Sequence, residues 1–253
     1  MQGVVEEALR KLGWQGKSIL AAGRTDTGAH ASGQVIACDL DWAHTPGELQ
    51  QALNNHLPDE VAVQQVRRVA PTFHPRYHAR WRRYRYSIYC QPVRDPLLER
   101  YAWRAWPTAN LEILQEAASL LPGKHDFAAF GTPPQAGSHT VRTVLQASWV
   151  AEAPHLVFEV GAHAFLYHMV RRLVFIQVMI GQGKLELDDL RNLLEGNRSA
   201  VALQGIKNGE QSPLIHGLAP AQGLVLVEVG YDPQAVNLVE DKEIIGYTPD
   251  AAA

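Results

Sequence analysis

Residues 79–90, ARWRRYRYSIYC, alternate between large apolar and charged side chains in the manner of a β-strand. The alternation puts Tyr84, Tyr86 and Ile88 on one face of the strand, and Arg83 and Arg85 on the other. From this pattern Tyr84 and Tyr86 are equally suited to packing in a core. The arginine-rich face suits either solvent or a phosphate backbone. We therefore predict a strand with one face against the core and one basic face.

The segments around this strand mix helical and strand patterns without a regular βαβ rhythm, which favours an α+β fold over a doubly wound one. Further strands are expected at 17–22, 33–39, 61–69, 141–150, 156–160 and 224–229. Helices are expected at 4–12, 45–57, 108–121, 165–181 and 188–195. Since no linker is evident, we predict one unit over residues 1–231, with approximate halves 1–105 and 106–231 sharing one sheet, and a disordered tail at 232–253.

The charges of the chain are unevenly distributed. The net charge is −3, yet residues 67–104 hold ten arginines, no lysine and two acids, a local balance of +8. The same stretch carries eight of the 20 aromatic residues. Guanidinium groups pair with phosphate and aromatic rings stack on unpaired bases, so nucleic-acid binding and a solvated strand face are both open.

The remaining bulk features are those of a soluble cytoplasmic protein. A hydrophobic fraction of 46% is ordinary for a globular chain, and neither a signal peptide nor a membrane-spanning stretch is evident. Cys38 and Cys90 lie far apart in apolar contexts, which favours buried free thiols over a metal site.

The loop Gly23-Arg24-Thr25-Asp26-Thr27-Gly28 follows an apolar segment and is bracketed by glycines, which allow unusual backbone angles and close approach of a ligand. Such a loop can hold Asp26 as an ionised nucleophile or base. An ordinary turn, in which Asp26 bonds its own backbone, explains the spacing equally simply. Spacing alone favours the ordinary turn.

A wider set of segments changes this balance, because together they resemble the TruA family of tRNA pseudouridine synthases. In chain order the segments are QGVVEEALRKL, AGRTDTGAHASGQV, ALNNHLPDEVAV, FHPRYHARWRRYRYSIY, GKHDFAAF, VRTV, GAHAFLYHMVRRLV and APAQGLVLVEVGY. They cover nearly the whole chain up to about residue 231. The resemblance implies a pseudouridine synthase fold, with a mostly antiparallel central sheet flanked by helices.

The resemblance also implies three catalytic residues. Asp26 matches the essential aspartate of the family, Arg171 matches its basic partner, and Tyr84 matches the tyrosine that stacks on the target base. Pseudouridine formation breaks the bond between ribose C1′ and uracil N1 and rejoins the sugar to C5. A carboxylate suits this reaction either by attack on the sugar or by abstraction of a ribose proton.

The implied partner is tRNA, at the anticodon stem-loop uridines of positions 38, 39 and 40, bound by a homodimer without metal or other cofactor. Arg24 matches a family residue that assists extrusion of the uridine. His30 either contacts RNA or is a structural histidine. The residues assigned to RNA binding are Arg24, His30, Arg76, Arg83, Arg85 and Arg172.

Two other functions remain open from the sequence. Residues Asp39-Leu40-Asp41 follow an apolar segment, as in magnesium-dependent phosphatases of the haloacid dehalogenase type, although Ala43 stands where that family has a hydroxyl residue. A non-catalytic RNA-binding scaffold is the other alternative. The TruA family ordinarily has a strand and an aromatic loop before its first helix, and residue 1 here lies almost at that helix, so a truncated or late-assigned start is expected.

Overall fold

The computed structural model describes residues 1–133, 137–196 and 217–232. The described residues form two compact units, which are treated separately below. One unit comprises residues 23–35 and 79–230, and the other comprises residues 1–22, 36–78 and the end of the chain from 231. The prediction of one unit over residues 1–231 stays a prediction.

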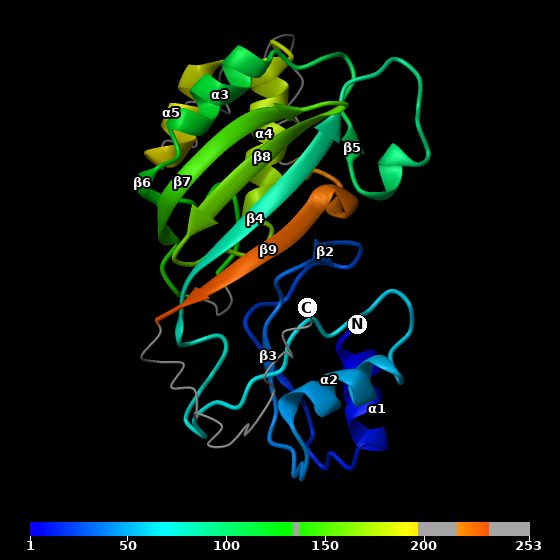
Figure 1. The fold of residues 1–253 in the computed structure, drawn as a ribbon. Helices are drawn as coiled ribbons and strands as arrows, with labels where there is room; N and C mark the ends of the chain where they lie inside the picture. Colours follow the sequence, from blue (N-terminus) through cyan, green and yellow to red (C-terminus); the bar gives the residue numbers. More distant parts are fainter. Residues whose placement is uncertain (134–136, 197–216, 233–253) are drawn as a thin grey trace, which may run out of the picture. The chain divides into compact units, whose positions relative to one another are not determined.

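The larger unit is built on a seven-stranded sheet with the strand order β2-β9-β4-β8-β7-β6, with β5 paired to β4 (Figure 1). The strands β4, β8, β7 and β6 pair antiparallel in succession, while β2 pairs parallel with β9 and β5 parallel with β4. Their bounds are β2 (His30–Ala31), β4 (Ala79–Tyr89), β5 (Trp103–Arg104), β6 (Gly123–Asp126), β7 (Val141–Glu152), β8 (His155–Ala162) and β9 (Leu224–Tyr231). The α+β prediction of a mostly antiparallel sheet flanked by helices is confirmed.

Helices α3 (Leu111–Ser119), α4 (Met169–Gly181) and α5 (Leu187–Leu194) cover one face of this sheet (Figure 1). Strand β4 turns Tyr86 and Ile88, both fully buried, toward these helices. The one polar side chain buried in α4, Gln177, accepts a hydrogen bond from Trp149 Nε1 at 2.9 Å and donates to Leu173 O at 3.0 Å. The core is therefore apolar, and its buried amide is satisfied on both sides.

The smaller unit holds α1 (Gln2–Lys11), α2 (Pro46–Asn54) and a two-stranded antiparallel sheet of β1 (Leu20–Ala21) and β3 (Ile36–Ala37). Helix α2 begins at a capping box between Thr45 and Glu48, with Pro46 at its first position. Its small core packs Leu9, Trp14 and other apolar side chains together.

Three expectations from the sequence are wrong. Residues 61–69 form no strand, because the Asn54 side chain of α2 takes both backbone groups of Val63, donating to its oxygen at 3.0 Å and accepting from its nitrogen at 2.7 Å. Helix α4 begins at Met169 rather than 165, because Tyr167 pairs with the backbone of Thr132. Cys38 is exposed, since β3 ends one residue before it.

In the part of the chain that the structure describes, no helix is long and apolar enough to cross a membrane. The predicted tail lies almost wholly in residues 233–253, outside the described residues.

Candidate active site

The Asp26 loop is anchored to strand β9, which lies next to the edge strand β2. Backbone nitrogens of Ser32 and Gly33 donate to Leu226 O at 3.0 and 3.1 Å, directly after the short parallel pairing of β2 with β9. Gly33 approaches β9 so closely that a Cβ there would lie 2.0 Å from Val227 O, so only glycine fits. Ahead of this anchor, Asp26 O accepts from Ala29 N at 3.0 Å and closes a turn. The sheet edge thus fixes where Asp26 stands.

Asp26 forms an ion pair with Arg171 of α4. Arg171 Nη1 donates to Asp26 Oδ2, and each side chain is only 12% exposed. Arg171 Nε donates to Ala219 O at 2.6 Å, so a carbonyl holds the second edge of the guanidinium. A carboxylate shielded to this degree requires a cation nearby, and Arg171 supplies it.

His168 is a member of this site that the sequence reasoning missed. Its Nε2 lies 3.6 Å from Asp26 Oδ2, the same oxygen that Arg171 binds. Both residues belong to the first turn of α4 or its cap, so Asp26 lies at the positive end of the helix dipole. The sequence signal that could have identified His168 is its position three residues before Arg171, about one helical turn away.

Tyr84 stands on the helix-covered face of β4, with its ring edge-on to Phe165 at 5.0 Å between centroids. The pKa of Tyr84 is raised to about 12, chiefly by burial, with a smaller lowering by Arg82 and a smaller rise from Asp26. The phenol is therefore neutral at physiological pH. Its strand neighbour Tyr86 is fully buried and donates to Pro220 O at 2.7 Å, directly after the carbonyl that holds Arg171.

Two predicted RNA-binding residues share the loop with Asp26. Arg24 is exposed, two residues before the carboxylate. The His30 ring packs against Tyr101 at 5.0 Å, and its Nε2 is buried without a hydrogen bond to any described residue.

The other predicted RNA-binding arginines are distributed more widely. Arg83 pairs with Glu228 at 2.7 Å, and Arg85 pairs with Glu159 at 3.1 Å and with Glu152. Arg172 follows Arg171 on α4, and its Nε is buried without a partner among the described residues. Arg76 belongs to the smaller unit, where its guanidinium lies 6.0 Å from the exposed ring of Tyr77.

Comparisons with known proteins show the family of this chain. The family model described as tRNA pseudouridine synthase matches residues 117–232, which include the first turn of α4. A tRNA pseudouridine synthase A of Syntrophotalea carbinolica is 37% identical over 234 residues, covering 92% of this chain and 88% of the relative. This chain belongs to the tRNA pseudouridine synthase A family. Members from Chloroflexus aurantiacus and Methylacidiphilum infernorum are each 36% identical, covering 95% and 92% of this chain and 83% and 87% of their own lengths.

Membership of the tRNA pseudouridine synthase A family identifies an isomerase and leaves the phosphatase alternative without support. No group of three or more His, Cys, Asp or Glu side chains suited to a metal occurs among the described residues. Asp39 and Asp41 lie in the smaller unit, after β3, and among the described residues no third side chain joins them to form a metal-binding group.

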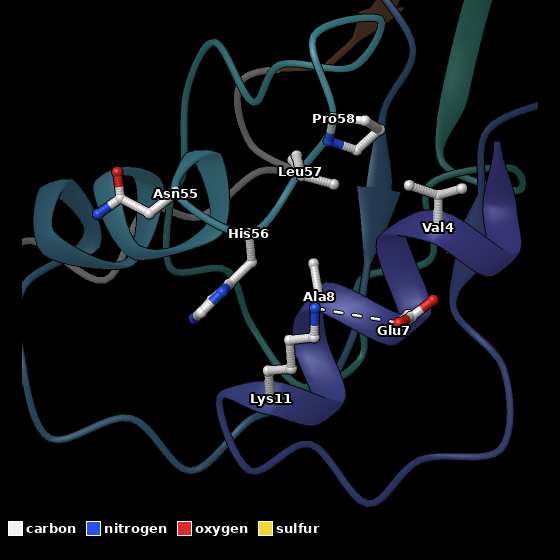
Figure 2. A pocket seen from close by; sticks show the side chains of 8 residues that line it. All are labelled: Val4, Glu7, Ala8, Lys11, Asn55, His56, Leu57 and Pro58. Atoms are coloured by element: carbon white, nitrogen blue, oxygen red, sulfur yellow. Dashed lines mark ion pairs between the residues drawn. The ribbon is translucent and has the colours of Figure 1, made fainter.

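A hollow of about 380 Å³ in the smaller unit lies between α1 and the segment after α2 (Figure 2). Glu7 and Lys11 form an ion pair of 3.9 Å along α1 at this hollow, and Val4 and Leu57 contribute apolar surface. None of its lining side chains belongs to the Asp26 site, and they do not form a set of catalytic residues.

Proposed function

We propose that this chain isomerises uridine to pseudouridine in tRNA, with Asp26 as the group that acts on the sugar or base. The observation that carries the proposal is the shielded ion pair between Asp26 and Arg171, whose carboxylate lies close enough to Tyr84 to raise the pKa of that phenol. A carboxylate held by a cation, with an aromatic ring in the same site, matches the needs of a reaction at a uridine.

The chemistry is balanced within the substrate. The C1′–N1 bond breaks, the uracil turns, a C1′–C5 bond forms, C5 loses its proton and N1 gains one. Asp26 serves either as a nucleophile at the sugar or as a base toward a ribose proton, and both roles use its ionised form. Since no electrons are gained or lost, the reaction calls for no redox cofactor.

Tyr84 is suited to hold the uracil in this scheme. Its neutral phenol ring has a π-face on which a flipped base can stack, and its T-shaped contact with Phe165 fixes its orientation. The hydroxyl is a second candidate group, for removal of the C5 proton.

Arg24 is suited to replace the uridine in the RNA stem, because it is exposed and only two residues from Asp26. We also propose His30 and Arg172 as RNA-contacting residues, through atoms other than His30 Nε2 and Arg172 Nε, which are buried. The target that we propose is the anticodon stem-loop at positions 38, 39 and 40. We expect the enzyme to act as a homodimer in the cytoplasm.

The test measures tritium release from tRNA labelled at uridine C5. The Asp26→Asn variant should release none while still binding tRNA, because the amide is nearly isosteric but carries no charge. The matched control is Asp188→Asn, which changes an exposed acid on α5 and should release tritium like the unchanged protein.

Equal release from Asp26→Asn and Asp188→Asn would contradict the proposal. If the unchanged protein binds tRNA tightly but releases no tritium from any tRNA, the non-catalytic scaffold would be the correct function.

A further inference from the structure

His168 stands out among the described residues by its backbone as well as its position. It is the one non-glycine residue with a positive φ, 66°, in the part of the chain that the structure describes. A side chain in this left-handed region costs roughly 1 kcal/mol, and such residues gather at functional sites. The question is what this conformation achieves.

The neighbouring backbone determines this conformation. Tyr167 exchanges backbone hydrogen bonds with Thr132, at 2.9 and 3.3 Å, while α4 begins at Met169. His168 must therefore turn the chain from an extended bridge into a helix within one residue. Its ring packs against that of Tyr167, with 3.7 Å between centroids, and makes no capping bond to α4.

The imidazole is thereby directed at Asp26 rather than at its own helix. Nε2 lies 3.6 Å from Asp26 Oδ2, and Arg171 Nη1 binds the same oxygen. Asp26 Oδ1, in contrast, receives no hydrogen bond from any described residue. The carboxylate is thus held by one oxygen and presents the other.

We infer that His168 is a positioning residue, whose imidazole holds Asp26 Oδ2 together with Arg171 and so leaves Oδ1 as the reacting oxygen. This inference rests on the proposed function, since it assumes that Asp26 carries the reaction. A slight approach of the ring converts the 3.6 Å contact into a hydrogen bond from Nε2–H. The neutral ring is sufficient for that role, because a neutral imidazole still carries one N–H.

The charge environment favours the neutral ring at physiological pH. Burial lowers the pKa of His168 below its usual 6.5, Asp26 raises it, and Arg171 and Arg172 lower it again. Among the described residues, those three charged groups and the Tyr167 side chain are the titratable groups at the ring. As the pH falls through this pKa, a second positive charge appears at Oδ2 and weakens the carboxylate as a nucleophile or base.

The experiment compares His168→Gly and His168→Gln in single-turnover tritium release from tRNA. Glycine tolerates the left-handed backbone and removes the ring, so the fold is kept while kcat falls on the order of tenfold and KM stays constant. Glutamine places an amide N–H at about the reach of Nε2 and should recover the larger part of this loss. The matched control is His155→Asn, at the first residue of β8. By strand register His155 is five positions from the residue opposite Tyr84, which places it about 17 Å from Tyr84.

The pH profile separates positioning from a structural role. The unchanged protein should lose activity below pH 6.5, and this part of the acid limb should be absent from His168→Gln, which cannot titrate. Unchanged kcat in His168→Gly, or an equal loss and the same pH profile in both variants, would overturn the inference. Asp26→Asn in the same assay keeps the proposals apart: if it is inactive while His168→Gly is fully active, only the role of His168 fails.

Discussion

The two faces of strand β4 differ in what their side chains contact. On the helix-covered face, Tyr84 and Tyr86 point toward the Asp26 site and the core, and the Tyr86 hydroxyl meets a backbone carbonyl. On the opposite face, Arg83 and Arg85 pair with carboxylates of β9, β8 and β7 while about a third of each arginine side chain stays exposed. The helix-covered face, called the shielded face below, therefore holds few polar groups with fixed partners. The face with Arg83 and Arg85, called the open face, holds charges that can change partners.

This difference predicts how each face responds to substitution. Removing a polar group from the shielded face leaves its partner without water or a replacement, which is costly. Removing a charge from the open face exposes its partner to solvent, which costs little. Four substitutions test that contrast, beginning with the one expected to change activity and stability most.

Arg171→Leu should have the largest effect, because it leaves Asp26 shielded without its cation. We expect kcat/KM to fall at least a hundredfold and the free energy of unfolding to drop by about 3 kcal/mol. Urea denaturation and tritium release measure the two effects. Arg171→Lys keeps the charge but not the paired hydrogen bonds, so its kcat/KM and its free energy of unfolding should lie between those of the leucine variant and the unchanged protein. A fully active leucine variant would break the comparison.

Tyr84→Ala should weaken substrate binding, because it removes the proposed stacking surface. The expected loss is about 1–3 kcal/mol of base stacking, seen as a higher KM in the release assay. Tyr84→Phe keeps the ring and should retain most activity. Because the Tyr84 pKa is about 12, the activity of Tyr84→Phe relative to that of the unchanged protein should stay constant from pH 7 to 9. An inactive phenylalanine variant would instead assign the hydroxyl to proton removal at C5.

Tyr86→Phe should destabilise the fold more than it affects catalysis. The substitution leaves Pro220 O without its 2.7 Å donor inside the protein, which costs about 1–2 kcal/mol of unfolding free energy. Activity should fall only a few-fold, through the adjacent Ala219 carbonyl that holds Arg171. Equal stability of the two proteins in urea would show that the carbonyl finds another partner.

Arg85→Gln should have the smallest effect on stability, between about 0 and 1 kcal/mol, since its pairs with Glu152 and Glu159 are partly exposed. If the open face binds RNA, Arg85 exchanges these carboxylates for a phosphate. In a plot of the logarithm of tRNA affinity against the logarithm of salt concentration, the slope for Arg85→Gln should then be smaller by the equivalent of about one phosphate contact. Arg191→Gln, from an exposed pair on α5, is the control and should leave this dependence unchanged. An unchanged slope for Arg85→Gln would remove Arg85 from the RNA interface.

Local patterns in the sequence were sufficient for much of the fold. The alternation in β4 fixed which residues share a face, and the apolar spacing of α3 and α5 marked helices within a few residues of their bounds. The expected strand at 61–69 failed because the decisive partner, the Asn54 side chain, comes from another element. The two-residue strands β2 and β5 are too short to leave a periodic pattern.

For the site, the sequence alone was enough to propose Asp26 as the reacting carboxylate and Arg171 as its cation, because the resemblance placed both residues in matching motifs. Tertiary structure decided what surrounds them: the Ala219 carbonyl behind Arg171, the Pro220 carbonyl on Tyr86, and the left-handed His168 beside Asp26. These contacts join distant segments, 48 and 134 residues apart in the two carbonyl hydrogen bonds, and their geometry depends on backbone positions that side-chain type and spacing do not encode.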